Sequence, residues 1–197
     1  DYRNAIQVFL KARWKYCSDQ RRAEIEYQIG NCLYLLNEYQ DASNVLGNYL
    51  VNEEEGEFGE NAIFFFVDCF YKLNNYLGAF QIFRKAIERY SKSNKVPGGI
   101  YCMGKSLRAM NMPESAIKIL REGLQAFPVD DTAGKMAFEI GMCYFDKGDY
   151  CLAYNAFDSF VKQYPQDELV VEAMIVMSDA LLNDKKYVEA TNSYFGL

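Results

Sequence analysis

The fold is decided by residues 141–165, which read GMCYFDKGDYCLAYNAFDSFVKQYP. The apolar side chains of this stretch recur at steps of three and four residues, which is the periodicity of one face of an α-helix. The four residues Asp146-Lys147-Gly148-Asp149 interrupt this pattern and are typical of a turn, with Gly148 available for a positive φ. The stretch therefore predicts two antiparallel helices joined by a short turn.

The same stretch is one copy of an internal repeat. Alanines stand 37 residues apart along the whole chain, at Ala5, Ala42, Ala79, Ala116, Ala153 and Ala190. A tyrosine stands three residues before each alanine, except at Pro113, and a large apolar residue stands four residues after it. Twelve residues before the alanines runs a column of mostly small residues: Gly30, Val67, Gly104, Gly141 and Ser178. Since a larger side chain would push two crossing helices apart, both small columns predict helix crossings.

Stacking of these hairpins is the expected architecture, because one helical hairpin alone buries only part of its apolar surface. The sequence predicts an all-α solenoid of stacked antiparallel helix pairs, in a single domain over residues 1–197. Its units are a partial unit at about 1–17, hairpins at about 21–56, 60–92, 97–128 and 132–165, and a truncated unit at about 168–197. Uncapped apolar end faces further predict that repeats continue beyond both ends, or that copies associate end to end.

The composition argues against several classes of function. The chain has 21 basic and 27 acidic side chains, a formal net charge of -6 and no histidine. An acidic protein is poorly suited to bind phosphates, so nucleic acid is not an expected partner. The absence of histidine removes serine–histidine and cysteine–histidine catalysis and most zinc sites. Direct membrane insertion is not expected either, because even the apolar run 64–70 is interrupted at Asp68. We therefore expect no enzyme, no cofactor and no metal site.

The cysteines bear on the compartment. None of the six forms a C-x-x-C pair; they are Cys17, Cys32, Cys69, Cys102, Cys143 and Cys151. Three of them share one repeat column, which predicts small buried side chains about 10 Å apart, too far for a disulfide. All six thiols are therefore expected to be unpaired, which favours the cytoplasm.

These columns resemble the tetratricopeptide repeats. The resemblance is carried by a small residue and an aromatic in the first helix, then Tyr-x2-Ala-x3-Phe and a closing proline. Residues 141–165 carry it as Gly141, Tyr144, Tyr150, Ala153, Phe157, Tyr164 and Pro165. The chain departs from the family in its 37-residue period, against the usual 34, and in lacking the early tryptophan. The longer period and the spacing from Phe157 to Pro165 resemble a bacterial cell-envelope subgroup that includes BamD and YbgF. That resemblance implies a right-handed superhelix and, for the subgroup, the periplasm or cell envelope.

In the tetratricopeptide repeats the first helix of each hairpin lines the concave face, so the resemblance places the binding surface there. Residues three before and four after the small column are largely aromatic, with polar residues between them on the same side. The expected partner-binding residues are Tyr27, Asn31, Tyr34, Phe64, Asp68, Tyr71, Tyr101, Lys105, Arg108, Phe138, Met142, Phe145 and Asp179. Such rings give a large contact area at a low entropic cost. The alternative is that they simply pack between neighbouring helices.

The leading hypothesis is a non-enzymatic scaffold that holds a peptide or a partner domain in this groove, as one part of a larger assembly. Chaperone tails are not expected, because the positions at which the family clamps a peptide carboxylate hold Tyr27, Phe64 and Phe138. Two alternatives remain open. One is a structural repeat segment that self-associates, and the other is a docking or regulatory segment of a protein whose catalytic part lies elsewhere.

Overall fold

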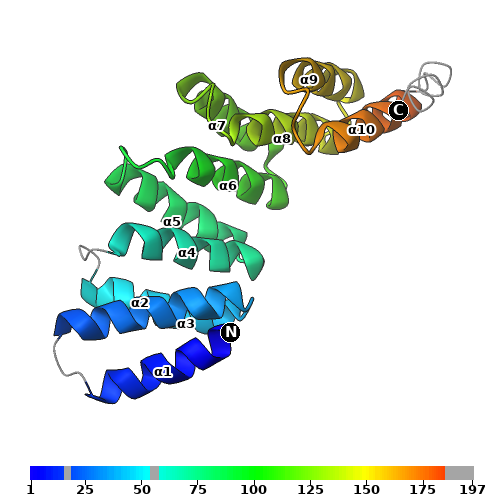
Figure 1. Cartoon of the computed structure of the whole chain (residues 1–197). Helices are drawn as coiled ribbons and strands as arrows, with labels where there is room; N and C mark the ends of the chain where they lie inside the picture. The colour runs from blue at the N-terminus through cyan, green and yellow to red at the C-terminus, as the bar shows by residue number, and fades with distance from the viewer. Residues whose placement is uncertain (16–18, 54–57, 185–197) are drawn as a thin grey trace. The chain divides into compact units, whose positions relative to one another are not determined.

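The computed structural model describes residues 1–15, 19–53 and 58–184. Over these residues the secondary structure is α-helical (Figure 1), which confirms the all-α prediction. The helices are α1 (Tyr2–Lys15), α2 (Asp19–Leu35), α3 (Tyr39–Glu53), α4 (Gly59–Lys72), α5 (Tyr76–Arg89), α6 (Val96–Ala109), α7 (Pro113–Ala126), α8 (Ala133–Asp146), α9 (Tyr150–Gln163) and α10 (Val170–Asn183). Even-numbered helices are the first helices of the predicted hairpins and odd-numbered helices are the second helices. Within this described part, no helix is long and apolar enough to cross a membrane.

The helices are divided between two compact units, Asp1–Val96 (unit 1) and Pro97–Leu197 (unit 2). Unit 1 holds α1 to α5, and unit 2 holds α7 to α10 and all of α6 except its first residue. Consecutive helices pack against each other from α1 to α5 in unit 1 and from α7 to α10 in unit 2 (Figure 1), and Gly104 of α6 lies against Leu120 of α7. A single continuous domain over the whole chain stays a prediction. The final predicted positions, Tyr187, Ala190 and Tyr194, lie outside the described residues.

Each described hairpin turns at one register position with a positive φ. The residues are Asn37 (φ 61°), Asn74 (φ 60°), Asn111 (φ 58°) and Gly148 (φ 78°). In the last of these turns, the Asp149 N–H donates to the Tyr144 carbonyl at 3.0 Å, and the other three turns make the equivalent bond. This is the left-handed C-terminal cap of a helix, where asparagine and glycine are tolerated best. The positive φ expected at Gly148 is confirmed.

The small columns lie where the helices of one hairpin approach closely. A Cβ added to Gly30 would lie 2.6 Å from Leu46 Cδ2, one on Gly104 2.4 Å from Leu120 Cδ2, and one on Gly141 2.6 Å from Phe157 Cε1. The alanine column is equally tight, since Ala42, Ala79, Ala116 and Ala153 are each 0% exposed. The large residue four positions after each alanine therefore fills the space opposite the small residue of the first helix. This confirms the predicted crossings.

The described cysteines are unpaired, as predicted: Cys32, Cys69, Cys102, Cys143 and Cys151. Cys17 lies outside the described residues. Burial raises the pKa of Cys69 and that of Cys143 to about 12, whereas Cys151 is exposed.

Because the thiolate is the nucleophile, iodoacetamide at about pH 8 should alkylate Cys151 at least about a hundredfold faster than Cys69 or Cys143 in the folded protein. Peptide mass mapping over time measures these rates, and the same reaction in urea serves as the control in which all of these thiols react. Equal rates for Cys69 and Cys151 in the folded protein would contradict the buried column.

Candidate functional site

In unit 1, the candidate surface begins with a bridge between two first helices. The Tyr34 hydroxyl of α2 donates a hydrogen bond to Asp68 Oδ2 of α4 at 2.6 Å. Burial, followed by the bond to Asp68, raises the pKa of Tyr34, so the phenol remains a proton donor. The Tyr34 ring also lies 5.0 Å from that of Phe65. A short bond between a phenol and a carboxylate is among the stronger hydrogen bonds, and here it ties together helices of neighbouring repeats.

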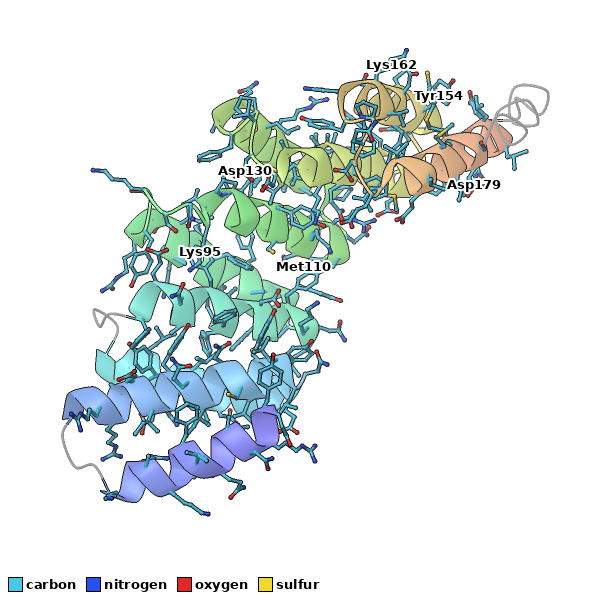
Figure 2. The ribbon with its side chains drawn as sticks, in the orientation of Figure 1. Lys95, Met110, Asp130, Tyr154, Lys162 and Asp179 are labelled. Atoms are coloured by element: carbon cyan, nitrogen blue, oxygen red, sulfur yellow. The ribbon has the colours of Figure 1, made fainter. Side chains whose placement is uncertain are left out.

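On the same helix α4, Phe64 and Tyr71 are both half-buried. The Lys95 ammonium lies 5.9 Å above the Phe64 ring and also donates to Asn61 Oδ1, while Tyr71 makes an edge contact with Tyr76 at 5.3 Å. Figure 2 labels Lys95, which directly precedes α6. The aromatic rings on this side of unit 1 are therefore accompanied by polar groups.

Two expected binding residues are instead core residues, which corrects the sequence prediction for them. Tyr27 is 5% exposed and stacks on Phe58 at 4.7 Å, and Phe138 is 6% exposed with its ring 5.3 Å from Phe157. A partner cannot reach rings that are covered on this scale. For these two positions the packing interpretation holds, and they are removed from the candidate surface.

The sequence carries a signal for this difference in the second helix of each hairpin, outside the first-helix columns. Seven residues after the repeat alanine, the second helix has an aromatic where the first-helix ring is buried: Tyr49 lies 6.0 Å from Tyr27, and Phe160 lies 5.8 Å from Phe138. The same position holds Ala86 and Gly123 in the other two hairpins, whose Phe64 and Tyr101 are only half-buried. A large second-helix residue thus covers the first-helix ring, and a small one leaves it partly open.

In unit 2, the candidate surface is built around Arg108 of α6. Its Nε lies 2.8 Å from Glu139 Oε2 and its Nη1 lies 3.1 Å from Asp146 Oδ2, both on α8. Glu139 is 4% exposed, and its Oε2 accepts no hydrogen bond despite the short ionic contact. Burial raises the pKa of Glu139, and Arg108 opposes that rise. Burial alone would lower the pKa of Arg108, but Glu139 and Asp146 raise it overall.

The remaining expected residues are half-buried. Lys105 places its ammonium 5.3 Å from the Tyr101 ring, and burial raises the pKa of that tyrosine. Phe145 makes an edge contact with Tyr150 at 5.5 Å. The other three are Asn31 on α2, Met142 beside the core of unit 2, and Asp179 on α10, which Figure 2 labels.

Three residues of the candidate surface were not among the predicted binding residues: Glu139, Asp146 and Lys95. Glu139 had a readable signal, since it is a charge between Phe138 and Ile140 in an apolar stretch of helix. A charge in such a place is normally paired. Lys95 had no such signal, because it precedes a helix and reaches Phe64 only through the tertiary fold.

The groups assembled at this surface are aromatic rings, hydrogen bonds and ion pairs. Among the described residues, no group of three or more histidine, cysteine or acidic side chains is placed to hold a metal ion. The surface combines half-buried rings with a phenol–carboxylate bond in unit 1 and an arginine–carboxylate cluster in unit 2. Such groups suit recognition of a polypeptide.

Comparisons with known proteins bear on the same interpretation. Residues 67–93 and 137–167 match the model of the tetratricopeptide repeat. No curated protein matches the chain significantly in sequence. These two segments are thus similar to tetratricopeptide repeats, and the narrower resemblance to the cell-envelope subgroup stays a prediction.

Solved structures share the fold at low sequence identity. The C-terminal part of a TPR repeat-containing protein from Cytophaga hutchinsonii is 19% identical with a TM-score of 0.75, covering 98% of this chain and 71% of that one. MamA from Desulfovibrio magneticus is 14% identical with a TM-score of 0.74, covering 92% and 94%. YrrB, a TPR protein with an unusual peptide-binding site, is 18% identical with a TM-score of 0.64, covering 94% and 88%. These likenesses confirm a TPR-like solenoid fold.

Proposed function

We propose that the chain is a non-enzymatic scaffold that binds a peptide or a segment of a partner protein on the faces of its first helices, as part of a larger assembly. The observation that carries this proposal is the half-buried set of rings and polar groups on adjacent first helices. In unit 1 these are Tyr34, Asp68 and Tyr71, and in unit 2 Arg108 and Phe145. Partly open aromatic rings beside fixed polar groups are the usual composition of a binding hot spot.

The fold supports the same proposal. A tetratricopeptide-like arrangement is consistent with a protein–protein interaction scaffold, and the similar structure of YrrB has a peptide-binding site. The polar bridges give a physical reason why such a surface keeps its shape. Tyr34 with Asp68, and Arg108 with Asp146, hold neighbouring first helices together before a partner arrives, which lowers the ordering cost of binding.

Truncation of the open rings tests the proposal. A partner is first isolated by affinity capture with the unmodified chain and identified by mass spectrometry. Tyr71→Ala and Phe145→Ala should then each weaken its binding by about 1 kcal/mol or more, or about fivefold. Leu77→Ala is the matched control, because Leu77 is a large apolar residue of the second helix α5 and is 57% exposed.

Binding and urea unfolding are to be measured on the same variants. Tyr71→Ala and Phe145→Ala should lose less stability than the roughly 3 to 5 kcal/mol expected for a fully buried ring. If instead these variants unfold readily while their folded fraction binds normally, the rings belong to the core and the proposal is wrong.

A further inference from the structure

A second surface, unrelated to the first-helix faces, lies in unit 1. A groove of about 790 Å³ opens between the second helices α3 and α5, with α4 beneath it. Helix α4 contributes Ile63 and Phe66 to this groove. At 100° per residue, these two lie on a different side of α4 from Phe64, Asp68 and Tyr71. The groove is therefore distinct from the candidate site described above.

One repeat position that lines the groove has no side chain. Gly47 of α3 lines it, and the same register position holds Arg84, Arg121 and Asp158 in the following hairpins. A Cβ added to Gly47 would lie only 3.1 Å from Phe66 Cε2. The missing side chain thus leaves the Phe66 ring as part of the groove wall, between α3 and α5.

The floor and the near edge of the groove are apolar. Leu50, Ile63 and Ile82 line it, and Val51 stands at its edge with 85% of its surface exposed. An apolar residue so open to water, next to an apolar hollow, is a feature of docking surfaces. The exposure of Val51 also shows that the groove is open along this edge, so that a segment of polypeptide can enter it from the side.

The opposite edge carries positive charge. Helix α5 places Lys85, Glu88 and Arg89 there. Two of these three charged residues are cations, and the one anion, Glu88, lies 3.9 Å from a third cation, Arg84. The whole chain carries a net charge of -6, so this edge runs against the overall balance. It is therefore suited to steer acidic groups toward an apolar floor.

We propose that this groove binds an amphipathic helical segment of a partner protein that has apolar residues on one face and acidic residues along one edge. The apolar face fills the hollow over Phe66, Ile63 and Ile82, as anchors at i, i+3/i+4 and i+7 do in helix-in-groove recognition. The acidic edge lies against Lys85 and Arg89. This inference does not depend on what the first-helix faces bind.

Two synthetic probes test this proposal with the full 197-residue chain. Both are fluorescently labelled helical peptides of about 18 residues with identical leucine positions, one with glutamates and the other with lysines beside the leucine face. Fluorescence anisotropy should show that the glutamate peptide binds at least about tenfold more tightly than the lysine peptide. Lys85→Glu should reduce or reverse this preference. Val51→Glu should lower the affinity for the glutamate peptide at least about fivefold.

Matched controls separate the groove from general effects of charge. Val129→Glu introduces the same change at a valine that is 95% exposed in unit 2, and Lys118→Glu does so at an exposed lysine of α7. Both controls should leave the affinity of the glutamate peptide within about twofold. Because Val51 is exposed, Val51→Glu is expected to fold, which circular dichroism checks. The proposal is overturned if the glutamate peptide does not bind, if both peptides bind equally, or if the controls weaken binding as much as the groove variants do.

Discussion

Truncating Phe157 to alanine is expected to lower the free energy of unfolding of unit 2 by about 3 to 5 kcal/mol. Phe157 is 0% exposed and sits against Gly141, with the Phe138 ring 5.3 Å away. Gly141 has no side chain that can move into the space, and the ring of Phe138 is itself held by Phe160. The cavity left by the substitution therefore collapses little, which places the cost in the upper range for core truncations.

Urea unfolding followed by circular dichroism measures this loss. Phe145→Ala is the matched control, because Phe145 is a half-buried phenylalanine of the same unit and should lose clearly less stability. A loss below about 1 kcal/mol for Phe157→Ala would show that the crossing between α8 and α9 was misassigned.

The second large effect is expected at Arg108. Arg108→Met keeps most of the side-chain volume but removes the cation that contacts the buried Glu139 carboxylate, which leaves Lys105 as the remaining cation that interacts with it. Removing one partner of a buried ion pair costs about 3 to 5 kcal/mol, and since the Arg108 side chain is 25% exposed we expect about 2 to 4 kcal/mol. Adding Glu139→Leu should restore most of this stability, because the uncompensated charge is then gone.

The stability loss expected for Arg108→Met should depend on pH in a definite direction. Burial raises the pKa of Glu139 above its ordinary value, so the folded state holds the proton more strongly than the unfolded state does. The contribution of such a group to stability is present at low pH and is lost as the pH rises through the folded-state pKa. Without Arg108 the pKa of Glu139 in the folded state is raised further, because Arg108 no longer opposes the rise. Arg108→Met should therefore cost less stability at about pH 5 than at about pH 8. A pH-independent loss, or no recovery in the double variant, would contradict a buried charge at Glu139.

The helical repeat could be read from the sequence because its information is local. The 3.6-residue periodicity, the small columns and the turn residues each act within one hairpin or between neighbours. The close approach of Gly141 to Phe157 and the positive φ of Gly148 follow from this register, and both are present in the structure. The chain's repeats and helix pairs were thus determined by the sequence alone.

The candidate site was predictable only in part, since the columns identify the side of a helix but not what covers it. Tyr27 and Tyr101 occupy equivalent positions, yet Tyr27 is 5% exposed and Tyr101 is half-buried. Besides Tyr49 of α3, Phe58, which precedes α4, packs on the Tyr27 ring. No periodicity within α2 contains that contact.

Tertiary structure likewise decided the ion cluster and the groove. Arg108 meets Glu139 and Asp146 through contacts between α6 and α8, and the groove brings Gly47 of α3 against Phe66 of α4. The physical reason is that burial and pairing are set by side chains from other helices, often more than thirty residues away, whereas helix formation and turning are set by a residue and its near neighbours.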